Sequence, residues 1–174
     1  MKNISYFLLA LVVISCSSIR VNTDYDKTTN FDSYKTYNYY TPLKTGLSEL
    51  DTKRLLDALD AKMKSRGFTL SDSPDFVVNI QSNEYQEAQR NNVGVGVGGG
   101  GGNVGGGISI GIPMGQANVN RQIIFDFVDD SKSGLFWQAV SESSYNPNAK
   151  PDQRQAQLQA IVEKVLSKYP PEKK

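Results

Sequence analysis

The sequence predicts an α+β fold in which a single mixed or antiparallel sheet carries two helices on one face, with a glycine-rich loop between two strands. Apolar stripes at helical spacing over residues 49–66 and 151–169 indicate the two helices. Runs rich in apolar residues at 76–81, 123–128 and 135–143 indicate strands. Because each amphipathic helix must bury its stripe, both helices are expected to cover the sheet.

The region before the first helix contains a run of β-forming residues at 34–40, followed by Thr41-Pro42. Proline cannot donate to a strand ladder, so we expect a strand that ends there. Asp24-Tyr25-Asp26 and Asn30-Phe31-Asp32 precede it and are interpreted as turns with one aromatic anchor each.

The first helix has a start signal, a stripe and a stop signal. Ser48 can cap it by accepting from the backbone near Asp51, and Gly67 can end it. The second helix begins near Pro151 and ends before the Tyr169-Pro170 pair. The stripes that should face the sheet are Leu55, Leu56, Leu59 and Met63 in the first helix, and Leu158, Ile161, Val162, Val165 and Leu166 in the second.

Residues 129–134 separate two of the strands by a polar segment with the composition of a hairpin loop. The returning strand should place Leu135, Trp137 and Ala139 on one inner face, because side chains alternate along a strand. Trp137 is therefore expected beneath one of the helices.

The N-terminal segment contains an apolar run that ends at Cys16, the only cysteine in the chain. Lys2 supplies a positive charge, and residues 4–14 match a secretory signal in length but fall short of the roughly 20 residues that span a bilayer. The Val-Ile-Ser-Cys sequence at 13–16 resembles the lipobox of bacterial lipoproteins. Cys16 is thus the expected lipidation site, with 1–15 as signal peptide and 16–20 as lipidated tether. The alternative is an ordinary signal peptide that happens to contain a cysteine.

Lipidation would place the protein in the cell envelope with its body in water. Two or three acyl chains such as palmitate hold a protein on a membrane stably, whereas one holds it reversibly. Ser17 follows the cysteine instead of the aspartate that retains lipoproteins at the inner membrane in enteric bacteria. This favours the outer membrane, on its periplasmic or surface face.

Composition restricts the chemistry. Lys and Arg number 19 and Asp and Glu 18, so loss of Lys2 with the signal leaves a formally neutral chain, which argues against nucleic-acid binding. The chain has no histidine, which excludes Ser-His-Asp and Cys-His machinery and most zinc sites. We expect no catalytic residue, cofactor or metal. Paired carboxylates keep a hydrolase of envelope polymer open as an alternative.

Residues 91–120 form an uncharged insertion, and 12 of the 15 glycines lie between Gly94 and Gly115. One interpretation is a flexible excursion between two strands. Another is packing in or on a bilayer, because GxxxG pairs such as Gly94/Gly98 and Gly107/Gly111 allow close approach. Residues 108–112 alternate and could form a strand. No lysine completes a phosphate-binding GxxxxGK[ST] loop.

Several motifs together resemble one known family. They are Asp24-Tyr25-Asp26, Lys35-Thr36-Tyr37, Arg66-Gly67-Phe68 and the strand segments 73–78, 124–129 and 135–139. Their order resembles that in bacterial lipoproteins carrying the domain of unknown function DUF4136, over residues 21–169, with 170–174 as a polar tail. The resemblance implies no activity and no catalytic residues. Gln138-Ala139 departs from the small residue, often Gly, that is usual there.

Aromatic residues offer one candidate binding surface. Tyr34, Tyr37, Tyr39 and Trp137, with Tyr25 and Tyr40, could line a platform for an envelope glycan or peptide. The competing interpretation places alternate tyrosines inside, under a helix, and is favoured.

The sequence therefore predicts a non-enzymatic, lipid-anchored envelope lipoprotein that acts as a binding or assembly module. Its expected partners are the membrane, through the N-terminal lipid, and an envelope protein or glycan. A membrane-active structural lipoprotein that inserts its glycine-rich segment is the main alternative.

Overall fold

The computed structural model describes residues 18–86, 119–131 and 134–172. They form one sheet of six strands in the order β1-β6-β5-β4-β2-β3. The elements in chain order are β1 (Arg20–Tyr25), the short 3-10 helix η2 (Phe31–Ser33), β2 (Thr36–Tyr39), α2 (Glu49–Ser65), β3 (Thr69–Leu70), β4 (Phe76–Gln86), β5 (Val119–Asp129), β6 (Gly134–Tyr145) and α3 (Pro151–Leu166).

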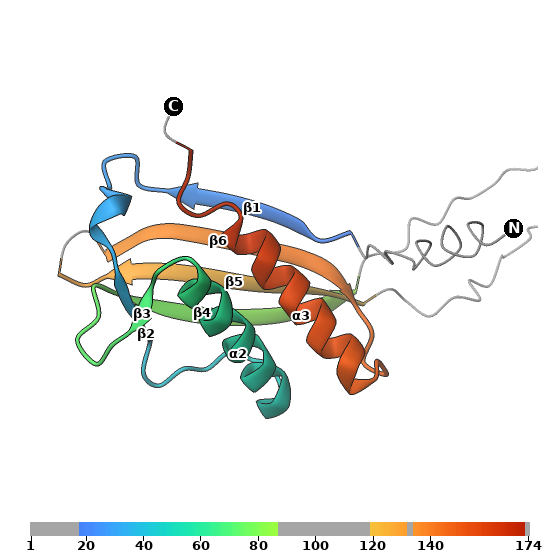
Figure 1. The fold of residues 1–174 in the computed structure, drawn as a ribbon. Helices are drawn as coiled ribbons and strands as arrows, with labels where there is room; N and C mark the ends of the chain where they lie inside the picture. Colours follow the sequence, from blue (N-terminus) through green and yellow to red (C-terminus); the bar gives the residue numbers. More distant parts are fainter. Residues whose placement is uncertain (1–17, 87–118, 132–133, 173–174) are drawn as a thin grey trace, which may run out of the picture.

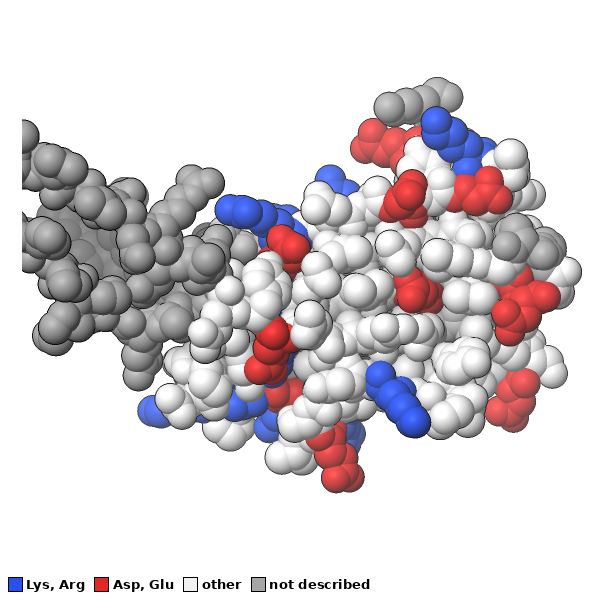
Figure 2. Space-filling view, turned by 180° about the vertical axis from the view of Figure 1, so that it is seen from behind, with Lys and Arg blue, Asp and Glu red and all other residues white. Residues whose placement is uncertain are grey.

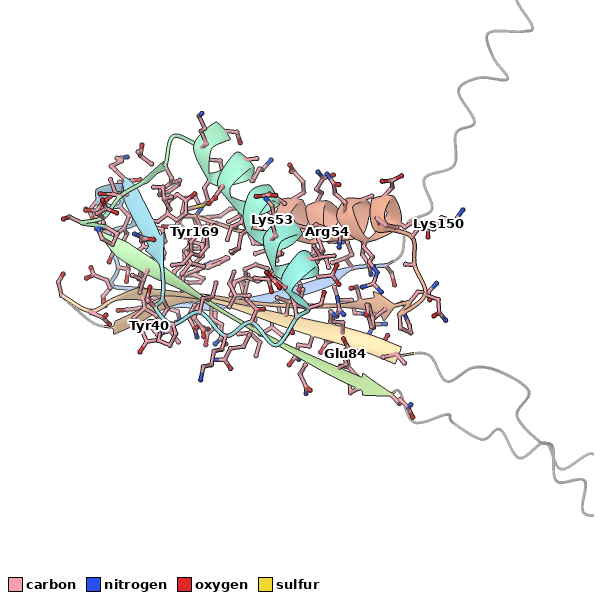
Figure 3. All side chains as sticks on the ribbon, turned by 90° about the horizontal axis from the view of Figure 1, so that it is seen from below. Tyr40, Lys53, Arg54, Glu84, Lys150 and Tyr169 are labelled. Carbon is pink, nitrogen blue, oxygen red and sulfur yellow. The ribbon has the colours of Figure 1, made fainter. Side chains whose placement is uncertain are left out.

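The sheet is mixed, and both helices lie on the same face of it (Figures 1 and 3). β2 runs parallel to β3 and β4, whereas β4, β5, β6 and β1 pair antiparallel. The predicted α+β class with two helices on one face is confirmed. The glycine-rich loop falls outside the described residues, apart from Val119 and Asn120, which belong to β5.

The first helix begins and ends where the sequence predicts. The Ser48 side chain accepts a hydrogen bond from the Asp51 backbone N–H at 3.2 Å, which satisfies one of the free amides of the first turn. After the helix, Gly67 adopts a φ of +86°, a left-handed conformation that glycine reaches without steric cost.

The core fills the space between the helices and the inner face of the sheet. Leu55, Leu59 and Met63 of α2 are completely buried. Opposite them, β4, β5 and β6 contribute alternate residues, as a sheet with one covered face should. The buried apolar residues of these strands are Phe76, Val78, Ile80, Ile123, Phe125, Phe127, Phe136, Trp137 and Ala139.

β1 is an element that the sequence did not reveal. The sequence predicts a turn at residues 24–26, but Asp24 and Tyr25 are part of a six-residue edge strand that pairs with β6. Its residues are mostly exposed and lack an apolar alternation, so the pattern that marks a half-buried strand is missing. Backbone pairing with β6 and packing of Val21 and Tyr25 on the core hold it instead.

β6 contains a bulge that corrects the predicted inner face. Phe127 pairs with Trp137, but Val128 pairs with Leu135, so Phe136 is an extra residue in β6. Phe136 and Trp137 are therefore both buried, whereas Leu135 is 50% exposed. The prediction that Leu135 shares the inner face of Trp137 and Ala139 is wrong, because the bulge lies between them.

The opposite face of the sheet is open. It carries the alternate residues of the central strands, such as Asn79, Asp126 and Gln138, which are partly exposed. Figure 2 shows this face, where charged side chains are few and scattered.

Candidate functional site

The four aromatic residues of the candidate platform do not form an exposed surface. Tyr34, Tyr37 and Trp137 are buried, at 3%, 2% and 0% exposure, and Tyr39 is partly buried. Trp137 packs against Phe127 and Tyr169, with ring centroids 4.6 and 5.1 Å away. These rings support the core, as the competing interpretation expected.

The tyrosine hydroxyls are tied to carboxylates. Tyr34 donates to Asp129 at 2.9 Å, and Tyr37 and Tyr39 both donate to the same Asp60 oxygen, at 2.6 and 2.5 Å. Burial, followed by the hydrogen bond to Asp129, raises the pKa of Tyr34 to about 12. Burial, then the bond to Asp60, raises the pKa of Tyr37 and of Tyr39. All three phenols are therefore neutral at physiological pH.

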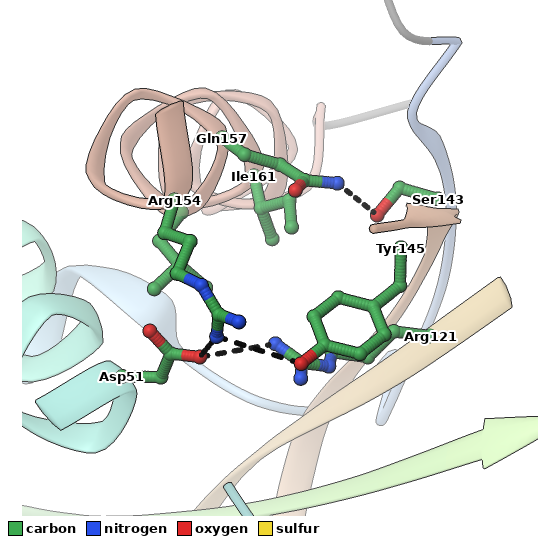
Figure 4. Close-up of a pocket in the computed structure, with 8 residues that line it drawn as sticks. Asp51, Arg121, Ser143, Tyr145, Arg154, Gln157 and Ile161 are labelled. Atoms are coloured by element: carbon green, nitrogen blue, oxygen red, sulfur yellow. Dashed lines mark hydrogen bonds and ion pairs between the residues drawn. The ribbon is translucent and has the colours of Figure 1, made fainter. Parts of the chain in front are cut away.

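The most concentrated charge in the described chain is a cluster around Asp51, which we call the Asp51 cluster (Figure 4). Asp51 is 1% exposed and meets three guanidinium groups. Arg54 lies 2.8 Å from Oδ1, Arg154 lies 2.8 Å from Oδ2, and Arg121 lies 3.6 Å from Oδ2. A buried carboxylate is tolerated because these cations replace its hydration.

Arg121 links the sheet to this cluster. It pairs with Glu84 at 2.7 Å, and its guanidinium carbon lies 3.5 Å from the ring centroid of Tyr145, a cation–π contact. Arg154 extends from α3 to the same place and also donates to the Pro147 carbonyl at 2.6 Å. One cluster therefore connects α2, α3, β4, β5 and β6.

The Asp51 cluster is a compact ion network with almost no free space beside it. The cavity beside it holds about 10 Å³, which is room for a single water molecule. Arg121 contacts both Asp51 and Glu84, so it occupies the space between these two acids. A glycosidase instead needs two carboxylates that face a shared substrate space. The arrangement suits an ion network better than a hydrolase.

Sequence reasoning missed this cluster, although a signal was present. Asp51 lies four residues before Leu55 on the same helical stripe, so its carboxylate falls on the buried face of the helix. Arg121 likewise alternates with Ile123 and Phe125 on the inner face of β5. A charge in a buried register requires partners, which these two residues supply to each other.

The cluster lies at one end of the sheet, and several chain segments meet there. Gln86, the last residue of β4, pairs with Val119, the first of β5, and Val119 pairs with Tyr145, the last of β6. Arg20, the first residue of β1, pairs with Glu142, close to the same end. We call it the tether end, because β1, the strand that begins at the end of the expected tether 16–20, starts there (Figure 1).

A second hollow opens at the edge of β4, next to the loop that joins β2 to α2. It has a volume of about 500 Å³ and is open to solvent. We call it the β4 cleft. Its lining residues are Tyr40, Pro42, Lys44, Thr45, Gly46, Asn79, Gln81 and Ser82.

Two expected features lie outside the described residues, namely lipidated Cys16 and the glycine-rich part of the insertion. Within residues 18–86, 119–131 and 134–172, no helix has the length and apolar character to span a membrane. The same ranges contain no group of three or more Cys, Asp or Glu side chains arranged to hold a metal ion.

Structural comparison finds a similar fold among solved proteins, including a PDZ domain protein and PelC. A PDZ domain protein from Parabacteroides distasonis superposes with a TM-score of 0.57 at 13% identity, over 90% of this chain. The chain spans only 37% of that protein's length. PelC from Paraburkholderia phytofirmans, solved as a dodecamer, superposes with a TM-score of 0.50 at 9% identity, over 86% of this chain and 95% of PelC. These likenesses show a shared fold.

Sequence comparison supplies the family. A search of curated proteins finds no match. The family model for the domain of unknown function DUF4136 matches residues 21–171, which is the whole of the sheet and both helices apart from Arg20. The chain therefore belongs to the DUF4136 domain family.

Proposed function

We propose that this protein is a lipid-anchored cell-envelope lipoprotein that acts as a non-enzymatic binding or assembly module, held to the membrane through Cys16. One observation carries the proposal: the start of β1 and the paired residues Gln86 and Val119 lie at the same end of the sheet. Only Ser17 separates Cys16 from the described chain, so a lipid there would hold the tether end close to the bilayer.

The proposed orientation leaves the rest of the domain available to partners. The open face of the sheet lies opposite both helices (Figure 3), and the β4 cleft is lined by Asn79, Gln81 and Ser82, which precede Gln86 at the tether end, so anchoring would cover neither. The fold also occurs in PelC, a protein solved as a dodecamer, which makes self-association one form of assembly to test. The outer membrane is the proposed location, because Ser17 follows Cys16.

The anchor is tested by labelling cells with a fatty-acid analogue. The wild-type protein should take up the label, and Cys16→Ala should remain unlabelled and uncleaved. A Ser17→Ala variant serves as a matched control that keeps the thiol and should label normally. Equal labelling of the wild type and Cys16→Ala would refute the anchor.

Placement of the tether end close to the bilayer also favours a second candidate function, in which the glycine-rich segment inserts in the bilayer. Both ends of residues 87–118 join the sheet at the tether end, where the anchor would bring them to the membrane. Proteolysis of intact protein separates the two candidates. Protection of the segment only when membranes are present supports insertion, and equal cleavage with and without membranes supports a solvent-facing segment.

A further inference from the structure

We propose that the β4 cleft binds an uncharged saccharide. The proposal rests on the proposed binding role, for which it supplies a site and a ligand class, but it does not depend on the anchor. It is carried by the shape of the cleft and by the polar and aromatic groups that line it.

The cleft has a fixed frame. The Tyr40 backbone N–H donates to the Val78 carbonyl at 3.0 Å, and the Ser82 N–H donates to the Thr45 carbonyl at 2.7 Å. Between these two hydrogen bonds, the loop from Tyr40 to Thr45 is separated from the edge of β4, and the gap is the cleft. The Thr45 and Thr52 hydroxyls, 2.7 Å apart, also tie the loop to α2. The site is thus preformed, which lowers the entropy cost of binding.

Gly46 brings the loop back onto the strand. Its φ is +75°, and a Cβ built there would lie 2.9 Å from the Ser82 carbonyl oxygen. Only glycine fits both the conformation and the close approach. Substitution of Gly46 by any other residue would therefore push the loop away from Ser82 and widen the cleft.

The lining groups suit the two faces of a sugar ring. Tyr40 is 50% exposed, and its ring can stack on the C–H surface of a pyranose. Among the described residues, the Gln81 amide and the Lys44 ammonium form no hydrogen bond or ion pair, so their donors and acceptors are free for a ligand. The Asn79 side-chain amide donates one long hydrogen bond, of 3.5 Å, to the Asp126 carboxylate. Amides both donate and accept, as sugar hydroxyls do.

The charges favour a neutral ligand. Among the residues that the structure describes, Lys44 is the only charged one that lines the cleft, and Asp126 is the cross-strand neighbour of Asn79 on β5. The two opposite charges make neither a strongly anionic nor a strongly cationic ligand favourable. The polar side chains continue as a row across the open face, because Asp126 accepts from Gln138 at 2.7 Å. Three strands span roughly 10 Å, which is enough for further sugar units.

An extended peptide fits the cleft less well. A peptide that adds to a sheet edge needs a row of free backbone groups. At this edge of β4, the Val78 carbonyl and the Ser82 N–H are already bonded to the loop. The binding groups that remain belong to side chains and are mostly polar, so a hydroxyl-rich ligand is favoured over a strand.

The test uses the full chain in detergent micelles and measures binding by calorimetry and by NMR shifts of side-chain amides. The probes are the N-acetylglucosamine tetramer, cellotetraose, tetragalacturonate and tetraalanine. At least one neutral tetrasaccharide should bind saturably and shift the Asn79 and Gln81 amides. Tyr40→Ala and Gln81→Ala should each weaken binding by about tenfold or more. Tyr85→Ala, which removes an exposed tyrosine of the same strand outside the cleft, should leave affinity unchanged.

Several outcomes would overturn the saccharide site. They are no saturable binding of either neutral tetrasaccharide, equal affinity in Tyr40→Ala and wild type, or binding of tetragalacturonate or tetraalanine alone. Fatty-acid labelling separates this failure from that of the proposed function. Labelled Cys16 without saccharide binding refutes the site and leaves the anchored module intact, whereas binding without label refutes the anchor alone.

Discussion

Asp51 of α2 and Arg154 of α3 form an ion pair of 2.8 Å although 103 residues separate them in the chain. The pair joins the N-terminal turns of the two helices at the tether end of the sheet. Arg121 adds β5 to the same cluster, and through Glu84 it also reaches β4. The strands on both sides of residues 87–118 are therefore linked to both helices by charge.

Asp51→Asn should destabilise the fold strongly. Three arginines would lose their shared carboxylate in a buried site, and breaking a buried ion pair from one side typically costs about 3 to 5 kcal/mol. Chemical denaturation measures the free energy of unfolding. Asp57→Asn is the matched control, because Asp57 pairs with Lys53 on the exposed face of the same helix and should cost less than about 1 kcal/mol. Equal losses in the two variants would refute the central place of Asp51.

Trp137→Ala should also destabilise the domain. It removes a fully buried ring, and such truncations typically cost about 3 to 5 kcal/mol. Leu135→Ala, two residues away on the same strand, should have an effect of about 0.5 kcal/mol or less because Leu135 is half exposed. Tryptophan fluorescence should report a ring shielded from water. A water-exposed emission and unchanged stability in Trp137→Ala would show that the ring is not in the core.

Stability should fall in alkali. The pKa of Tyr34 is raised to about 12 from 10.0 by burial and by Asp129, so the folded state keeps a proton that the unfolded state loses. This contribution is complete below about pH 10 and is lost as the pH rises through 12. The Tyr37, Tyr39 and Tyr169 pKa values are also raised, so they act in the same direction.

Denaturant midpoints measured from pH 8 to 12 test this expectation. Tyr34→Phe removes one of the ionising groups and should flatten the alkaline decline relative to wild type. A midpoint that stays constant through this range, or an identical decline in Tyr34→Phe, would contradict the burial of a neutral phenol beside Asp129.

Replacing residues 93–107 by a short linker should shift the melting temperature little. Gln86 and Val119 are already paired, so the linker only closes a hairpin between β4 and β5, and loop-closure entropy changes slowly with length. Thermal unfolding followed by circular dichroism measures the shift. A loss of several kcal/mol would show that the segment contributes packed structure.

The predictable parts of the fold are those determined locally. Leu55, Leu59 and Met63 repeat at helical spacing, and Ser48 and Gly67 mark the helix ends, so the sequence alone indicates α2. β1 was not predictable because an exposed edge strand has no apolar alternation and depends on β6 for its hydrogen bonds. The bulge at Phe136 likewise depends on the register between β5 and β6, which no local pattern encodes.

The candidate sites likewise contain some features that follow from local sequence and others that depend on tertiary structure. Burial of Tyr37 and partial burial of Tyr39 follow from alternation along a strand under a helix, whereas Tyr34 precedes β2 and is buried by tertiary packing. The residues of the Asp51 cluster come from five elements that the sequence does not bring together. The β4 cleft depends on the path of the loop from Tyr40 to Gly46 against β4. Tyr40 could be named as an aromatic candidate, but its exposure required the tertiary structure.

The orientation of the domain on the membrane is the most direct test of the account. Single cysteines introduced at Asn148, in the loop at the tether end, and at Asp72, at the opposite end before β4, can carry a fluorophore, since the one native thiol would be acylated. Each labelled full-length protein is placed in vesicles that contain quencher-bearing lipids. We expect strong quenching at position 148 and little at position 72. Stronger quenching at position 72, or equal quenching at both, would contradict a domain anchored with its tether end toward the bilayer.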